Sequence, residues 1–184
     1  SPNHKLIPAV IIDMKSFVKK EIIDGNNKFS LEIEEIEKFF DFYKTKNYMI
    51  CAIFQDSSVA NGERLPIQVE LDVNSIINLF EKNPFGIIKS CLHDRNGNTE
   101  PYCHRSMLEF GNGGILAAIE ITAWENMKII DWKNSIVVGV DSDMELMANG
   151  ANLDFKPIDE FCTMVSVKME HDANIKCESF EKLL

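Results

Sequence analysis

Apolar residues in the first half of the chain gather in short blocks separated by polar residues. Compact apolar runs over residues 6–13 and 48–54 have the length of buried strands. Between them a helix is predicted over residues 31–45, with Ser30 as its N-cap, because apolar residues recur there at helical spacing. The residues of that stripe are Ile33, Ile36, Phe39, Phe40 and Tyr43.

The remaining elements are predicted from shorter signals of the same kind. Further strands are expected over residues 18–23, 66–71, 85–92 and 163–169, and short helices over residues 73–81 and 179–184. The polar stretch 94–100 contains Asn96-Gly97 and is typical of a tight turn between two strands. These signals predict a chain with more strand than helix.

The stretch 113–161 reads as four or five short strands with polar breaks, a pattern typical of a small, strongly bent antiparallel barrel. Its order of glycines, an Ala-rich strand, an aromatic turn and an acidic strand end resembles the core of a Tudor domain. The match covers about a quarter of the chain. It is carried by Ala117, Ala118, Trp124, residues 138–141, Glu145, Leu153, Pro157, Ile158 and Phe161.

The resemblance extends to the flanking segments, since Tudor cores often sit in an extended unit with a staphylococcal-nuclease-like half. The fold class expected from it is α+β and mainly antiparallel, with a Tudor-like small β-barrel packed on a second strand-and-helix lobe. The lobe would comprise residues 1–112, the barrel residues 113–161, and the return strand and helix residues 162–184.

The same resemblance implies a protein–protein interaction domain rather than an enzyme. It suggests an adaptor that binds a peptide of a partner protein, in small-RNA (piRNA) or germ-granule biology. The peptide-binding residues expected from it are Trp124, Ser142, Asp143 and Phe155. Ser142 stands where the family has an aromatic residue, so an aromatic cage for methylarginine would lack a wall and an unmodified peptide is expected instead.

Composition adds a constraint on partners and on compartment. A formal net charge of -10 over 184 residues disfavours direct nucleic-acid binding and favours basic peptide segments. No apolar run is long enough to span a bilayer, so no membrane partner and a cytoplasmic location, including perinuclear RNA granules, are expected. An odd number of cysteines, five, indicates free thiols in a reducing compartment. No cofactor is expected.

Acidic residues that follow two apolar strands support an alternative function. Asp13 follows one strand, and Asp141, Ser142 and Asp143 follow another, which resembles the nucleophile and magnesium segments of haloacid-dehalogenase (HAD) phosphatases. That family has a second Asp two positions after its nucleophile, and this chain has Lys15 there. The alternative is therefore a magnesium-dependent phosphatase or an inactive relative. The main interpretation, turn carboxylates without catalysis, predicts no hydrolytic activity.

A zinc site is a further alternative. Cys91 and His93 precede the predicted turn, and Cys103 and His104 follow it, so thiolates and imidazoles would approach each other. Neighbouring residues of a strand point to opposite faces, however, so Cys103 and His104 would not both reach one ion. The sequence-based prediction is therefore that the protein holds no metal.

Overall fold

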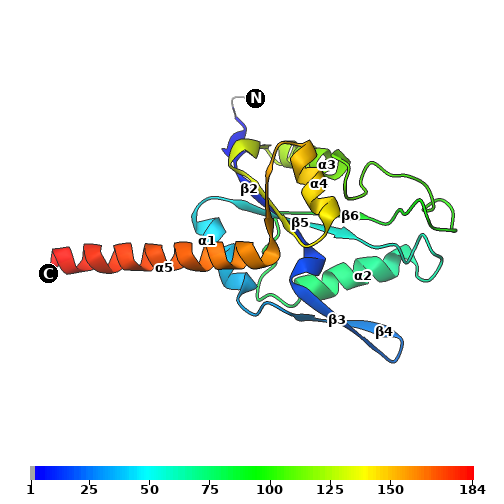
Figure 1. Cartoon of the computed structure of the whole chain (residues 1–184), viewed down its shortest axis with the longest axis horizontal. Coiled ribbons are helices and arrows are strands. Elements are labelled where there is room, and N and C mark those ends of the chain that lie inside the picture. The colour runs from blue at the N-terminus through cyan, green and yellow to red at the C-terminus, as the bar shows by residue number, and fades with distance from the viewer. Residues whose placement is uncertain (1–2) are drawn as a thin grey trace.

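The computed structural model describes residues 3–184, and its centre is a five-stranded parallel sheet (Figure 1). Its strands follow the spatial order β6-β5-β2-β8-β9, and every neighbouring pair is parallel. The strands are β2 (Ala9–Asp13), β5 (Met49–Gln55), β6 (Ile87–Cys91), β8 (Ile136–Gly139) and β9 (Asp154–Pro157). Strand β2 lies in the middle, where Val10 is opposite both Ile50 and Ile136.

The central strands are apolar on both faces because helices cover both sides of the sheet. All five residues of β2 and all four of β8 are buried. Val10 and Ile12 of β2 pack with α1 (Ile36–Thr45), α2 (Pro66–Ile77) and α5 (Ile158–Leu183). Ala9 and Ile11 pack on the other face with α3 (Gly114–Glu125) and α4 (Ser142–Gly150). Continuous apolar strands are what a parallel sheet between two helical layers requires.

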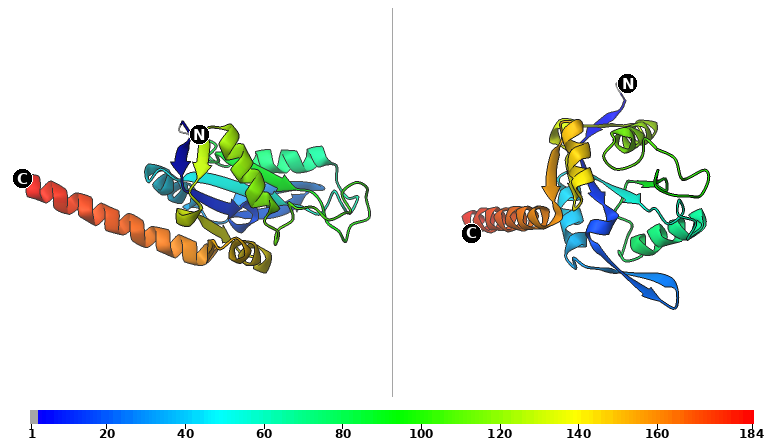
Figure 2. Two further views of the ribbon diagram at one scale, coloured as in Figure 1. Left: turned by 90° about the horizontal axis from the view of Figure 1, so that it is seen from above. Right: turned by 45° about the vertical axis from the view of Figure 1, so that its right-hand side comes forward.

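Smaller elements surround this three-layer core. Strands β1 (Lys5–Ile7) and β7 (Lys128–Ile130) form a short parallel pair. Strands β3 (Val18–Ile23) and β4 (Asn26–Leu31) form an antiparallel hairpin, whose turn residues Asp24 and Gly25 have positive φ angles. Two short 3-10 helices are η1 (Met14–Ser16) and η2 (Trp132–Asn134). Figure 2 shows that α5 runs well beyond the rest of the molecule.

The predicted antiparallel barrel is wrong, because its main segments are helices. Residues 114–125 form α3 and residues 142–150 form α4, while the strands between and after them (β7, β8 and β9) all pair in parallel. In α3 the buried residues Ile115, Leu116, Ile119 and Ala123 recur at helical spacing. Ile121 and Trp124 on the exposed side are also large and apolar, which hid this stripe in the sequence. The fold class is therefore α/β with a parallel sheet.

Two other pairs of predicted elements are single helices in the structure. The strand expected over 66–71 and the first part of the helix expected over 73–81 form one helix, α2, which ends at Ile77. The strand over 163–169 and the helix over 179–184 lie within or at the end of α5. The helix predicted over 31–45 is confirmed from Ile36 onward, since residues up to Leu31 pair in the hairpin as β4.

Candidate active site

Asp13 ends the central strand of the sheet, and its carboxyl group is buried. Its side chain is 3% exposed. It caps η1, where Asp13 Oδ1 accepts a hydrogen bond of 3.1 Å from the Lys15 backbone N–H. The Ser16 hydroxyl donates to the Asp13 carbonyl oxygen over 2.6 Å. An apolar strand followed directly by a capped turn thus fixes one carboxyl group at the carboxyl edge of the sheet.

The electrostatic environment of Asp13 disfavours its charge. Burial is the main cause that raises the pKa of Asp13 to about 6. The Lys15 backbone N–H and the Lys15 ammonium group act in the opposite direction and lower the pKa. The Asp141 carboxylate raises the pKa further. A poorly solvated carboxylate that remains ionised at neutral pH can attack an electrophile or bind a cation.

Asp141 approaches Asp13 because β2 and β8 are adjacent parallel strands. Strand β8 ends at Gly139, and Asp141 is the exposed N-cap residue of α4. On the other side of β2, strand β5 ends at Gln55, and the next residue, Asp56, accepts a 2.8 Å hydrogen bond from the Ser58 backbone N–H. Polar groups at the carboxyl ends of parallel strands are where open α/β sheets bind their ligands.

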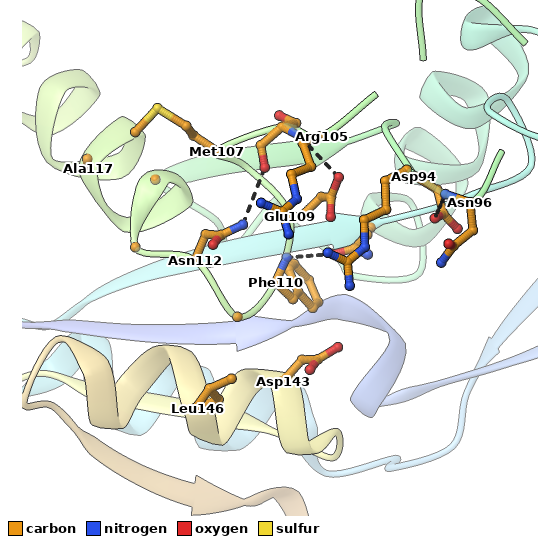
Figure 3. Close-up of a pocket in the computed structure, with 16 residues that line it drawn as sticks. Asp94, Asn96, Arg105, Met107, Glu109, Phe110, Asn112, Ala117, Asp143 and Leu146 are labelled. Carbon is orange, nitrogen blue, oxygen red and sulfur yellow. Dashed lines mark hydrogen bonds between the residues drawn. The ribbon is translucent and has the colours of Figure 1, made fainter. Parts of the chain in front are cut away.

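A cavity of about 980 Å³ opens beside this edge, and its lining includes Gln55 and Asp143 but neither Asp13 nor Asp141 (Figure 3). One wall is the start of α4, with Asp143 and Leu146. The opposite wall is the loop of residues 92–113 between β6 and α3. This loop is held over the sheet by Gln55, whose Oε1 accepts a 2.7 Å hydrogen bond from the Phe110 backbone N–H. The other lining residues are Asp94, Arg95, Asn96, Arg105, Ser106, Met107, Glu109, Gly111, Asn112, Gly113, Gly114 and Ala117.

Two exposed arginines give this cavity its cationic groups. Within the described part of the chain, neither Arg95 nor Arg105 forms an ion pair or a side-chain hydrogen bond. Two of the three acidic side chains of the loop accept hydrogen bonds from its own backbone. Glu109 Oε1 accepts a 3.1 Å hydrogen bond from the Ser106 backbone N–H. Asp94 Oδ1 accepts a 2.9 Å hydrogen bond from the Asn96 backbone N–H. The guanidinium groups therefore remain free to bind an anionic ligand.

The structure separates the four residues that the sequence assigned to peptide binding. Ser142 and Asp143 lie in the first turn of α4, and Asp143 lines the cavity. Trp124 is at the end of α3, where its ring stacks on the ring of His4 with centroids 3.8 Å apart. Phe155 lies on β9 and packs against the core beneath α3 and α4. Trp124 and Phe155 do not line the cavity, and peptide binding by these residues stays a prediction.

The cavity arginines, Gln55 and Glu109 were missed by sequence analysis. One signal was available, since two of the chain's three arginines lie in the stretch 94–112, which has no strong periodicity. A long irregular connection between a strand and a helix often carries functional residues. Cys91 is buried in β6, with its thiol donating to the His93 carbonyl oxygen over 3.8 Å. The alternative grouping of Cys91 and His93 with Cys103 and His104, which the sequence analysis considered and did not favour, is not formed among residues 3–184.

Comparison with known proteins supports a HAD-like fold. No family model matches the chain, and no curated protein matches it. A protein from Mesorhizobium loti, described as a candidate HAD-like phosphatase, is 12% identical with a TM-score of 0.69. The alignment covers 88% of this chain and 86% of that one. An uncharacterized protein from Listeria monocytogenes serotype 4b is 12% identical with a TM-score of 0.58, over 89% of this chain and 97% of that one.

These similarities overturn the Tudor resemblance and what was inferred from it. The structure has a parallel sheet instead of a Tudor barrel and a nuclease-like half, and the Mesorhizobium loti protein is described as a candidate phosphatase, so the adaptor and non-enzyme interpretations are wrong. The expected setting in small-RNA pathways and perinuclear granules loses its basis for the same reason. Over residues 3–184, none of the helices combines the length and the apolar character needed to cross a membrane.

Proposed function

We propose that the protein is a phosphatase that transfers the phosphoryl group of an anionic phosphoester to Asp13 and then to water. The observation that carries the proposal is the buried Asp13 carboxyl group at the end of the central strand, with Asp141 close enough to affect its ionisation. The similarity in fold to the Mesorhizobium loti protein supports it, because that protein is described as a candidate HAD-like phosphatase.

The chemistry needs two displacements at phosphorus. The ionised Asp13 carboxylate attacks the phosphorus atom of a bound phosphomonoester, the new P–O bond to Asp13 forms, and the P–O bond to the leaving group breaks. Water then attacks the phosphorus of the acyl phosphate, inorganic phosphate leaves, and the Asp13 carboxylate is regenerated. The hydrogen bond from the Lys15 N–H keeps Asp13 oriented throughout.

A magnesium ion fits the carboxylates at this edge. Mg²⁺ is usually bound by one or two carboxylates, substrate phosphate oxygens and water, rather than by a complete cage of protein ligands. Asp13 and Asp141 form such a pair, since the charge of Asp141 raises the pKa of Asp13 and a cation would relieve that repulsion. When bound, the ion would neutralise charge on the phosphoryl oxygens. Asp13 and Asp141 are the residues that would hold it.

Lys15 places an ammonium group where HAD phosphatases have a second carboxyl group, two positions after the nucleophile. Its ammonium group lies 5.1 Å from the centroid of the Phe54 ring, next to the end of β5. A cation here stabilises negative charge on the phosphoryl group and lowers the pKa of Asp13. An ammonium group is a weaker acid than a carboxyl group, so it protonates a leaving oxygen less readily. The site therefore suits phosphoesters whose leaving groups need little protonation, such as aryl phosphates.

Turnover of p-nitrophenyl phosphate with Mg²⁺, and a single amide substitution, test the proposal. Asp13→Asn should lower kcat about a thousandfold or more, because it removes the nucleophile but keeps the size of the side chain. Asp154→Asn is the matched control, since Asp154 is exposed at the start of β9, on the opposite edge of the sheet. Turnover that survives Asp13→Asn, or wild-type protein that hydrolyses no phosphoester, would contradict the proposal.

A further inference from the structure

The loop of residues 92–113 carries a cluster of three possible metal ligands, separate from the carboxylates at the strand ends. Its members are Glu100, Cys103 and His104, whose ligand atoms all lie within 4.8 Å of one another. His104 Nε2 is 2.6 Å from Glu100 Oε2. Within the described part of the chain, no other group of three or more His, Cys, Asp or Glu side chains is this compact.

The backbone conformation explains why these side chains converge. The N–H groups of Tyr102 and Cys103 both donate to the Thr99 carbonyl oxygen over 3.0 Å, so residues 99–103 form a turn rather than a strand. This turn, which contains the cis peptide bond between Glu100 and Pro101, brings the ligand atoms of Cys103 and His104 to within 4.8 Å of that of Glu100. Cys103 and His104 thus lie beside Glu100. The sequence-based argument that they point apart assumed a strand and is wrong here.

The turn is held in place from both sides. The Asp94 N–H donates to the Tyr102 carbonyl oxygen over 3.0 Å, which pairs the two arms of the loop. The N–H groups of Asn98 and Thr99 donate to the Ala60 carbonyl oxygen over 2.8 and 2.9 Å. Packing is close there, since a Cβ atom on Gly97 would lie 2.5 Å from that oxygen. The backbone that presents the three ligands is therefore anchored before any ion binds.

The ligand types select among cations. A thiolate, an imidazole and a carboxylate together suit Zn²⁺, which accepts sulfur, nitrogen and oxygen in a tetrahedral arrangement. Mg²⁺ and Ca²⁺ prefer oxygen ligands alone. The side chains of His104 and Glu100 are 63% and 71% exposed, so an ion can reach them from solvent and water can take the fourth position.

We propose that Glu100, Cys103 and His104 form a zinc site that fixes the loop over the candidate active site. The loop also carries Arg95 and Arg105, the free cationic side chains of the cavity. An ion bound at residues 100–104 restricts the backbone between these two arginines. The zinc site therefore sets the shape of the cavity rim without taking part in the chemistry at Asp13.

Zinc affinity of the full chain with reduced thiols tests the site directly. The measurement is a competition titration against a chromophoric zinc chelator, with Cys103→Ser, His104→Ala and Glu100→Gln beside the wild type. We expect one zinc ion per chain, and each substitution should weaken binding by about tenfold or more, because each removes one of three protein ligands.

The chain offers matched control residues on α5. His171 and Cys177 are both exposed there, and Figure 1 shows that helix extending away from the loop. His171→Ala and Cys177→Ser should leave zinc affinity unchanged. Loss of binding in these controls, or wild-type affinity in Cys103→Ser, would overturn the assignment of the site.

Two further readouts separate this site from nonspecific binding to thiols. Cobalt(II) bound to wild-type protein should show the near-ultraviolet absorption of a metal–thiolate bond, and Cys103→Ser should lose it. Zinc should also slow tryptic cleavage after Arg95 and Arg105, because the ion restrains the loop that contains both bonds. Cleavage at the same rate with and without zinc would overturn the proposed effect on the loop. None of these measurements depends on phosphatase activity.

Discussion

At the scale of single residues, Asp13 couples stability to the proposed chemistry. Burial raises its pKa from 3.8 to about 6 in the folded protein. The folded state therefore holds the proton more tightly than the unfolded chain. The stabilisation from this difference is complete below about pH 4 and is lost as the pH rises through 6. An ionised, poorly solvated carboxylate at neutral pH is thus a stability cost that a catalytic role explains.

Asp13→Asn should therefore stabilise the protein at neutral pH. The amide can still cap η1 but carries no charge, so the free energy of unfolding relative to wild type should rise by about 2–3 kcal/mol between pH 4 and pH 7.5. Urea denaturation at the two pH values measures the difference. The exposed Asp154→Asn variant is the control. If the difference in the free energy of unfolding between mutant and wild type does not change with pH, burial does not raise the pKa of Asp13.

Arg95 and Arg105 should act on substrate binding rather than on the chemical step. Each lies on the cavity rim with no protein partner among residues 3–184, so each is available to a phosphoester. Replacing either with Ala should raise KM about tenfold, the loss expected for one charged hydrogen bond, and change kcat little. Arg→Lys variants should recover part of the affinity because they keep the charge.

Steady-state kinetics with an aryl phosphate measures both parameters. Lys133→Ala makes the same change in net charge in η2, which precedes β8 and so lies at the opposite edge of the sheet. An equal rise in KM for this control would mean that only the overall charge of the protein matters. A loss in kcat alone would place the arginines at the reacting phosphoryl group.

At the scale of elements, the sequence analysis located most of the strands but took several helical segments for strands as well. Strand β5, the hairpin strand β3 and the later part of α1 follow directly from apolar runs and helical spacing. Helix α3 was misread because Ala-rich and β-branched residues are mixed in it, and because its exposed face carries Ile121 and Trp124. Once α3 and α4 are taken for strands, a parallel sheet cannot be inferred, since parallel strands need helical crossovers.

The candidate site was predictable only in part for the same reason. Asp13 and Asp141 were recognised because each follows an apolar run that forms a strand. The arginines belong to a loop whose path depends on contacts with Ala60 and Gln55, which are distant in the sequence. Periodicity carries no information about such contacts. The alternative function was therefore visible in the sequence, but its cavity was not.

The junction of the loop with α3 should be sensitive to a single methyl group. A Cβ atom on Gly114 would lie 2.0 Å from the Met107 carbonyl oxygen, whereas one on the adjacent Gly113 would have no neighbour within 4 Å. Gly114→Ala should destabilise the protein by about 1–3 kcal/mol, because backbone must move to accept it. Gly113→Ala should be neutral or slightly stabilising. Chemical denaturation measures the free energy of unfolding of both variants. A Gly114→Ala variant that is as stable as Gly113→Ala would mean that the backbone at Met107 moves aside at no cost in free energy.

At the scale of the whole molecule, the sheet joins segments from both halves of the chain, whereas α5 reaches far outside it. Strand β2 near the start pairs with β8 late in the sequence, and the buried residues of α5 are Ile158, Phe161 and Val165. These three buried residues all lie near the beginning of α5. The core is therefore complete well before α5 ends (Figure 2).

Removal of residues 174–184 should leave the stability of the protein almost unchanged. Every side chain in that segment is exposed, and the 2.6 Å ion pair between Lys46 and Asp172 is retained. The free energy of unfolding should fall by less than about 1 kcal/mol, whereas Phe161→Ala should cost about 3–5 kcal/mol. Phe161 is fully buried and stacks on Tyr43 with ring centroids 5.7 Å apart. Urea denaturation compares the two variants, and a large loss on truncation would show that the projecting half of α5 contributes to the folded core.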